Sequence, residues 1–223
     1  MNESFWSTVG SIAPFASAEA LSYTPVVGAL VLLLGDRGRR AAVIYLVGWL
    51  TALAVVATTF VVGGRALMPR VRIHGPVVGV VEIVAGLALV VVGVVAWRGR
   101  AISGRTIDRL LDRLEEAHGP ALFFAGLLLG LGPKSLLLGL SAGVVVRQAS
   151  LPLAEVVLAV VAYVVLAGWT VALPVVASFV GPKAANRWFE AVERWLTRHG
   201  SLVTAIVLAV VGVVVVVDGI GRY

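Results

Sequence analysis

The stretch Leu127-Leu-Leu-Gly-Leu-Gly-Pro-Lys134-Ser-Leu-Leu-Leu-Gly-Leu140 places a lysine and a proline in the middle of an apolar run long enough to cross a membrane. A cation at that depth costs roughly 3 kcal/mol or more to insert. Gly132-Pro133, directly before it, interrupts helical hydrogen bonding at the same level. A broken helix beside a mid-depth charge is how secondary transporters build substrate sites. We therefore expect Lys134, Pro133 and Gly132 to bind substrate; the alternative is a lysine that snorkels to an interface.

Composition fixes the class of protein. The 223 residues are 60% hydrophobic and 13% charged, whereas soluble domains carry about 25% charged residues. The chain is therefore expected to be an all-α, multi-pass membrane protein. It has no cysteine, which excludes disulfides and thiolate metal sites. The net charge of +6 does not indicate nucleic acid, because the basic residues lie in short loops where they set topology and contact anionic lipids.

Six membrane spans are predicted within one domain of residues 1–223, each near the ~20 residues that cross the hydrocarbon core. They cover about 9–34, 41–63, 75–97, 120–146, 152–180 and 200–221. The loops after the first, third and fifth spans hold twelve basic residues against five on the other side. The positive-inside rule then places both termini on the extracytoplasmic side of the plasma membrane.

Two linkers have the pattern of interfacial helices. In 103–118, part of the linker 98–118, apolar residues recur at helical spacing opposite Arg, Asp and Glu. In 184–199, Trp188, Val192 and Trp195 do the same. Both are expected on the cytoplasmic surface, either as plain anchors or as segments that engage lipid.

The two halves of the chain, about 9–97 and 120–221, resemble each other. Gly48-Trp49 is followed after 44 residues by Gly93, and Gly168-Trp169 after nearly the same distance by Gly212. A repeat of three spans inserts its second copy upside down, as in many secondary transporters. The fold prediction is therefore two inverted three-helix repeats with spans one and four interrupted by Pro or Gly. The alternative is similar helix packing without a shared site.

Three further residues are candidates for substrate binding: Glu19, Pro25 and Glu82. Glu19 precedes Pro25 in the first span, and it can pair with Lys134 if spans one and four face each other. If the first span begins nearer Leu21, Glu19 lies at the surface instead. Glu82 shares a helix face with glycines of the third span, so it is expected to point into the bundle, as a cation or proton site or as a neutral packing group.

Other chemistry is not indicated. The sequence has no metal-ligand spacing, no nucleophile–base arrangement and no phosphate-binding loop. We expect neither an enzyme nor a bound cofactor. The glycine pairs 126/130 and 139/143 flank the break in span four and predict close helix packing, and glycine-rich faces also allow a homodimer.

Several short motifs resemble one known family. They are a proline-containing first span, Asp36-Arg-Gly-Arg-Arg40, Gly48-Trp49, Pro133-Lys134, and Trp195-Leu-Thr-Arg-His199 before Asp218-Gly-Ile220. Together they resemble the GAP family, the peptidoglycolipid- or sulfolipid-addressing proteins of mycobacteria and related actinobacteria, within the lysine-exporter (LysE-like) superfamily. That superfamily usually has Asn-Pro-Lys in span four. Gly132 stands where that pattern has Asn, so the resemblance carries over to Pro133 and Lys134 and not to Gly132.

The resemblance implies that the protein moves a cell-envelope glycolipid or anionic lipid across or out of the plasma membrane, alongside a larger lipid exporter. Two alternatives stay open. One is an exporter of a small solute, an amino acid or a cation, as elsewhere in the superfamily. The other is an accessory subunit that does not transport, in which Lys134 and Glu19 form a structural pair.

Overall fold

Every element of the computed structural model that is described, over residues 3–35, 38–67, 75–98, 119–180 and 182–221, is helical. Two pairs of helices are each divided by a sharp bend at a two-residue break, after residue 20 and after residue 130. The helices are α1 (Glu3–Ala20), α2 (Tyr23–Leu34), α3 (Gly38–Leu67), α4 (Gly75–Arg98), α6 (Gly119–Gly130), α7 (Pro133–Gln148), α8 (Leu153–Val180) and α9 (Pro182–Ile220).

Three of these helices are long and apolar enough to cross a membrane, in the segments Gly38–Gly63, Leu153–Val180 and Arg198–Val217. The bent pairs α1–α2 and α6–α7 raise the number to five if each pair is one span. The chain is therefore a membrane protein. The predicted third span coincides with α4, in which Gly86–Val95 qualifies as a shorter apolar helix within the described part.

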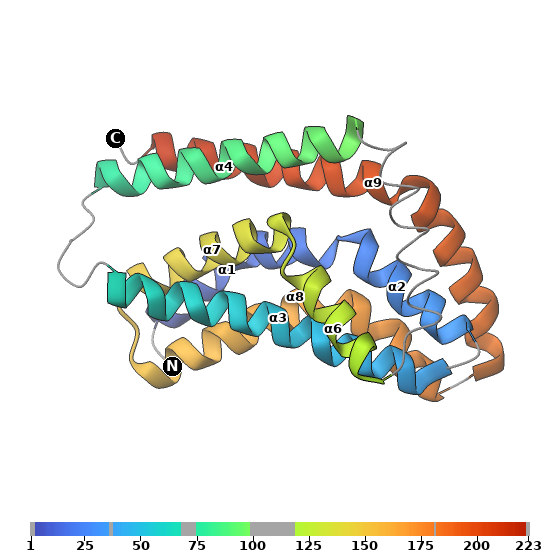
Figure 1. Cartoon of the computed structure of the whole chain (residues 1–223). Helices are drawn as coiled ribbons and strands as arrows, with labels where there is room; N and C mark the ends of the chain where they lie inside the picture. Colours follow the sequence, from blue (N-terminus) through green and yellow to red (C-terminus); the bar gives the residue numbers. More distant parts are fainter. Residues whose placement is uncertain (1–2, 36–37, 68–74, 99–118, 181, 222–223) are drawn as a thin grey trace.

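The helices form two groups. α4 lies along the second part of α9, at one side of the molecule (Figure 1). The other group contains α3 packed on α6 and α7, and α1 packed on α8 and α7. α2 connects the groups because it contacts α9 as well as α3 and α8. α1 begins and α9 ends at the same end of the molecule (Figure 1).

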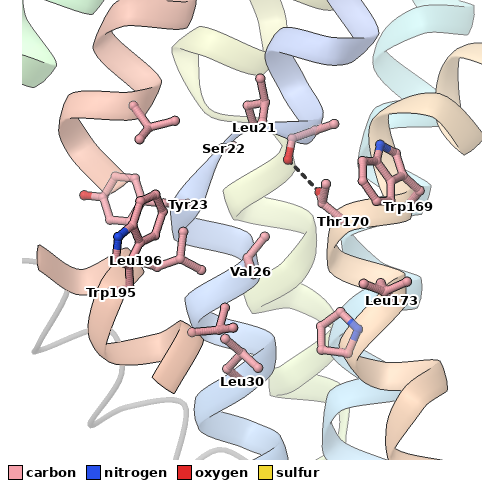
Figure 2. A pocket seen from close by; sticks show the side chains of 14 residues that line it. Leu21, Ser22, Tyr23, Val26, Leu30, Trp169, Thr170, Leu173, Trp195 and Leu196 are labelled. Atoms are coloured by element: carbon pink, nitrogen blue, oxygen red, sulfur yellow. Dashed lines mark hydrogen bonds between the residues drawn. The ribbon is translucent and has the colours of Figure 1, made fainter. Parts of the chain in front are cut away.

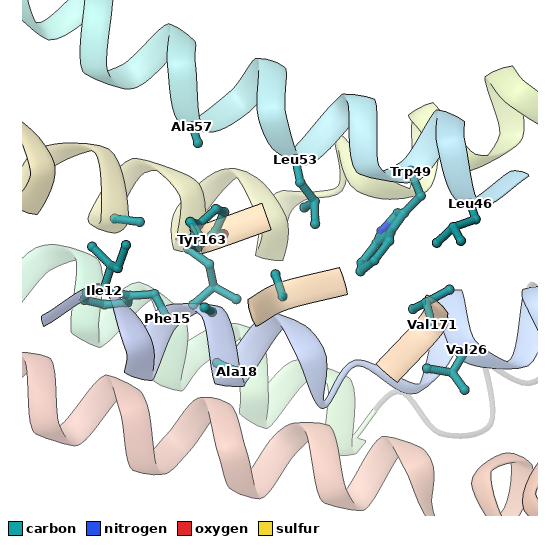
Figure 3. Packing of buried hydrophobic residues seen from close by; sticks show 14 of the residues in the cluster. Ile12, Phe15, Ala18, Val26, Leu46, Trp49, Leu53, Ala57, Tyr163 and Val171 are labelled. Atoms are coloured by element: carbon teal, nitrogen blue, oxygen red, sulfur yellow. The ribbon is translucent and has the colours of Figure 1, made fainter. Parts of the chain in front are cut away.

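Large apolar side chains fill the space between α1, α3 and α8 (Figure 3). Trp49, Leu53 and Tyr163 are fully buried there, beside Ile12 and Phe15. The outer faces are also apolar, with exposed valines and leucines along α4, α8 and α9. Apolar side chains on both the inside and the outside are expected where lipid tails replace water, since the tails are as apolar as leucine.

Glycines let α6 and α7 approach α3 closely, as the sequence predicted. A Cβ at Gly126 would collide with the Tyr45 backbone carbonyl, and one at Gly130 would lie 2.5 Å from the Ala52 Cβ. Further along, a Cβ at Gly143 would lie 2.7 Å from the Phe60 Cβ. Both glycine pairs that flank the second break therefore face one neighbour, α3, with no room for a side chain.

The second amphipathic segment differs from its prediction as a separate interfacial helix. Residues 184–199 form the first part of α9, which continues without interruption into the last span. No proline lies between residues 184 and 220, so nothing in the local sequence ends the helix. In Figure 1 this first part runs at an angle to the rest of α9. The first amphipathic segment, 103–118, lies outside the described residues.

Candidate functional site

The first break lies earlier than the proline that was predicted to cause it. α1 ends at Ala20 and α2 begins at Tyr23, with a bend of 51° between them. Pro25 sits in the first turn of α2, where a missing N–H leaves no intrahelical bond unmade. The interruption itself falls at Leu21 and Ser22, so Pro25 follows the break and does not form it.

The second break lies where the sequence placed it. α6 ends at Gly130 and α7 begins at Pro133, with a bend of 63°. Gly132 caps α7 in an extended conformation and Pro133 takes the first helical position, which is the favoured location for proline. Lys134 and Ser135 therefore project from the first turn of α7. In both broken spans a proline lies in the first turn after the break.

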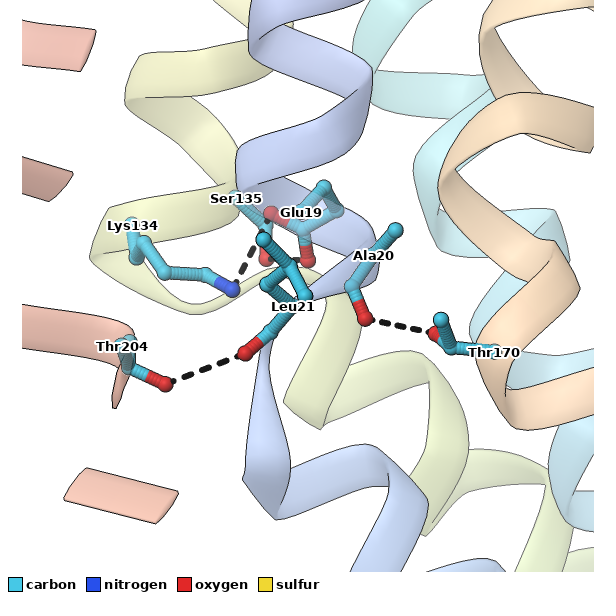
Figure 4. A network of polar contacts seen from close by, with 7 residues as sticks. All are labelled: Glu19, Ala20, Leu21, Lys134, Ser135, Thr170 and Thr204. Carbon is cyan, nitrogen blue, oxygen red and sulfur yellow. Dashed lines mark hydrogen bonds and ion pairs between the residues drawn. The ribbon is translucent and has the colours of Figure 1, made fainter. Parts of the chain in front are cut away.

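Glu19 and Lys134 meet between the two breaks (Figure 4). The distance from Lys134 Nζ to Glu19 Oε2 is 3.3 Å, and the Ser135 hydroxyl donates a hydrogen bond of 2.8 Å to Glu19 Oε1. The Glu19 side chain is 1% exposed, which excludes the alternative of a surface carboxylate. Lys134 keeps 15% of its side chain exposed, but its Nζ atom is buried, so the exposed part is the aliphatic stem. The lysine therefore directs its charge into the bundle and does not snorkel.

The ends of the two helices support this pair. Glu19 lies in the last turn of α1 and Lys134 in the first turn of α7, so each charge is unfavourable for the dipole of its own helix. Across the contact the arrangement is reversed. Glu19 accepts from Ser135 at the positive end of α7, and Lys134 lies beside the negative end of α1 (Figure 4). Each helix thus stabilises the charge of the other.

Two threonines bind the carbonyl groups that the first break leaves free. Thr170 of α8 donates a hydrogen bond of 2.6 Å to the Ala20 carbonyl, and Thr204 of α9 donates one of 3.3 Å to the Leu21 carbonyl. The last carbonyls of a helix have no intrahelical partner, and in a membrane water cannot replace one. The two threonine side chains, from two neighbouring helices, therefore stabilise the interrupted backbone at the first break.

The same region contains polar atoms with unused hydrogen-bonding capacity. Glu19 Oε2 and Lys134 Nζ form an ion pair, but neither makes a hydrogen bond of good geometry within the described part of the chain. The Tyr163 hydroxyl is buried on α8, within electrostatic range of Glu19, and has no hydrogen-bond partner among the described residues. A buried group without a partner costs free energy, so this cluster is poised to bind a polar group.

An apolar pocket of about 280 Å³ opens beside the first break (Figure 2). It lies between the α1–α2 junction, α8 and α9. Trp169 and Trp195 stand on opposite sides of it. Its lining is mainly apolar: Ala20, Leu21, Ser22, Tyr23, Val26, Leu30, Trp169, Thr170, Leu173, Pro174, Val192, Trp195, Leu196 and Val203.

The predicted site residues are only partly brought together. Lys134, Glu19, Pro133 and Gly132 gather where the two breaks meet. Pro25 faces α3, where its carbonyl accepts a hydrogen bond of 3.3 Å from the Tyr45 hydroxyl. Glu82 lies on α4, and its side chain is outside the described part, so its orientation stays a prediction.

Sequence reasoning missed Ser135, Thr170, Thr204 and Tyr163. Ser135 had a local signal, because it directly follows the intramembrane lysine. Thr170 follows the repeated Gly168-Trp169, but its counterpart after Trp49 is Leu50. Hydroxyls in an apolar span were a weak signal, since each can bond within its own helix, as Thr51 does with the Val47 carbonyl.

Comparison with protein families gives the class of this protein. A buried ion pair between two broken helices, in a chain with several apolar helices that can span a membrane, defines a membrane protein with a buried polar site. Over residues 12–221 the chain matches the family described as Sap, sulfolipid-1-addressing protein. The chain belongs to that family, and the family name indicates a role in lipid trafficking. Neither the curated proteins nor the solved structures contain a match to it.

Proposed function

We propose that this protein is a transporter that moves a cell-envelope glycolipid or an anionic lipid across or out of the plasma membrane. The observation that carries the proposal is the buried Glu19–Lys134 pair, which joins the two broken helices. Intramembrane charges are costly and mark transport pathways. Membership of a sulfolipid-addressing family supplies the class of substrate.

The proposed mechanism is competition for Lys134. Its Nζ atom holds Glu19 at 3.3 Å without a well-formed hydrogen bond, so its donors are available to a sulfate, phosphate or carboxylate headgroup. When the headgroup takes Lys134, Glu19 keeps its bond from Ser135 and can accept a second one from Tyr163. The α1–α7 contact would then loosen, because the ion pair that crosses it is replaced.

We also propose six spans in two inverted repeats. The order of a broken pair followed by two helices occurs twice, as α1–α2, α3, α4 and as α6–α7, α8, α9. Each broken pair packs on the middle helix of the other half: the first pair packs on α8 and the second packs on α3. α4 and α9, the last helices of the two halves, pack on each other. Inverted repeats of this kind place the site at the interrupted helices.

In the proposed topology the basic loops face the cytoplasm and both termini are extracytoplasmic. The guanidinium carbon of Arg39, after the first broken span, lies 5.5 Å from the ring centre of Phe179 at the end of α8. This contact supports a common side for the loops that follow the first and fifth spans. A larger lipid exporter and a second copy of the chain are the proposed partners, and membership of the lysine-exporter superfamily is part of the same proposal.

The test is lipid analysis in a deletion strain of the source organism, with surface-exposed and cell-retained pools separated. We expect one envelope glycolipid to shift from the surface to the cell. Wild type should restore it, whereas Lys134→Ala at matched protein level should not. An unchanged surface pool in the deletion strain would contradict lipid transport and leave export of a small solute to be tested in proteoliposomes. Normal rescue by Lys134→Ala would contradict the site.

One observation favours a second candidate, a non-transporting accessory subunit. Glu19 and Lys134 neutralise each other in the structure, as a purely structural pair would. Replacing both with apolar residues distinguishes the two. Glu19→Leu combined with Lys134→Met should keep function in a scaffold, because the buried charges are removed together. A transporter should lose export and remain folded.

A further inference from the structure

We propose that the pocket beside the first break binds one hydrocarbon chain of a lipid. The inference rests on the proposed function in that the same lipid would present its headgroup to Lys134. Its observations are independent of the ion pair: the volume of the pocket, its lining and its position between helices that are apolar enough to span a membrane.

The lining selects an apolar occupant. Of the fourteen residues, Ser22, Tyr23 and Thr170 carry hydroxyl groups and the two tryptophans each carry one indole N–H, and the Thr170 hydroxyl already donates to the Ala20 carbonyl. The volume of about 280 Å³ is about twice that of a cavity that binds benzene. None of the described residues that line the pocket is charged, so an ionic ligand would have no partner among them.

The pocket extends along one face of α2. Tyr23, Val26 and Leu30 line it, and they lie on one face of that helix. Seven residues separate the first from the last, which is about 10 Å at the helical rise of 1.5 Å per residue. An extended chain fits such a shape better than a compact group.

The surroundings identify the chain as that of a lipid. α8 and the segment Arg198–Val217 of α9 are apolar enough to span the membrane, and both form walls. Trp169, Leu173 and Trp195 line the pocket and are each about half exposed, so its mouth faces outward from the bundle. In a membrane, lipid tails would lie outside such a mouth. Large aromatic side chains at the rim provide extensive apolar contact area for a single chain.

The pocket also reaches the polar site. Ala20 and Leu21 line it, and Glu19 is the next residue along α1. A hydrocarbon chain held between Trp169 and Trp195 therefore lies next to the first break, beside which Lys134 pairs with Glu19. Binding the chain and binding the headgroup would then occur on two sides of one junction.

The test is photolabelling of the purified protein in liposomes with phosphatidylglycerol that carries a diazirine in one acyl chain. Labelled positions are mapped by mass spectrometry. We expect labelling to concentrate on residues 169–174 and 192–203, above the level of the exposed face of α8 near Val161. Val203→Trp and Leu173→Trp, which fill the pocket from two helices, should each lower this labelling about tenfold, as a loss of 1.4 kcal/mol would.

Matched controls are Val210→Trp on α9 and Val165→Trp on α8. Both residues are exposed and neither lines the pocket, so labelling should keep its wild-type pattern. Uniform labelling of the outer faces, unchanged by both filling variants, would overturn the chain site. Concentrated labelling together with normal export by Lys134→Ala would support the chain site and overturn the headgroup site. Loss of export in Lys134→Ala without concentrated labelling of the pocket would support the headgroup site and overturn the chain site.

Discussion

The two breaks in this molecule are built alike and surrounded differently. The second, between α6 and α7, is pressed against α3 by glycines that leave no room for a side chain. The first, between α1 and α2, has a pocket on one side and depends on threonines of α8 and α9 to satisfy its carbonyls. The ion pair connects the two. From this difference we propose that the second break is a fixed support and that a ligand enters beside the first.

Removing one charge of the pair should have the largest effect on stability. Lys134→Met leaves Glu19 buried with only Ser135 as a partner, and breaking a buried pair in this way costs about 3–5 kcal/mol. Glu19→Leu combined with Lys134→Met should recover most of that loss. The measurement is SDS-driven unfolding in mixed micelles. Equal stability of the single and double variants would contradict coupling across the breaks.

The tight packing of the second break can be tested with one methyl group. Gly126→Ala should destabilise the protein by about 1–3 kcal/mol, because its Cβ would meet the Tyr45 backbone, which cannot move aside like a flexible side chain. Gly63→Ala is the control on α3, since a Cβ there meets nothing within 4 Å. Thermal unfolding in detergent would compare them. A stable Gly126→Ala protein would show that this break is not a fixed support.

The threonines of the first break should have smaller effects. Thr170→Val keeps the shape and removes the bond to the Ala20 carbonyl, at a loss of about 1 kcal/mol. Thr204→Val should lose less, because its bond is longer, at 3.3 Å. Thr51→Val, whose hydroxyl bonds only within α3, is the matched control. If unfolding titrations show a larger loss of stability in Thr51→Val than in Thr170→Val, the role of these hydrogen bonds between helices is contradicted.

The smallest effect on stability is expected at Tyr163. Tyr163→Phe removes a buried hydroxyl that has no hydrogen-bond partner in the described structure, so stability should stay the same or rise. Lipid export should nevertheless fall if this hydroxyl donates a hydrogen bond to the Glu19 carboxylate when substrate binds Lys134. The two readouts therefore separate packing from transport. A clear loss of stability would mean that the hydroxyl has a partner in the resting protein.

Much of this arrangement could be predicted because its signals are local. An intramembrane lysine after Gly-Pro marks a broken helix, and the glycine spacing marks the face that packs. Pairing of Glu19 with Lys134 was also accessible, since a buried charge needs a partner. The break and the packing face depend on residues within one or two helical turns, where sequence spacing determines the face on which a side chain lies. The pairing joins two distant helices, and it was predictable because few other charged residues lie within the apolar spans.

Features that depend on distant helices could not be predicted. The first break precedes Pro25 because Thr170 and Thr204, about 150 and 180 residues away in the chain, bind the freed carbonyls. The repeated Gly-Trp motifs looked equivalent, yet Trp49 is buried on α3 while Trp169 is half exposed beside the pocket. Similar local sequence was placed in different surroundings by different neighbours. The pocket, which α1, α2, α8 and α9 form together, has no signal in any one of them.

The most direct test of the central claim, that Glu19 and Lys134 act as one unit across the two breaks, is an exchange of the charges. Glu19→Lys and Lys134→Glu should each abolish export of the envelope glycolipid, because each places two like charges together. The double exchange restores opposite charges at the two positions. We predict that the double variant regains export that both single variants lack. Wild-type export by either folded single variant, or a folded double variant as inactive as the singles, would contradict the account.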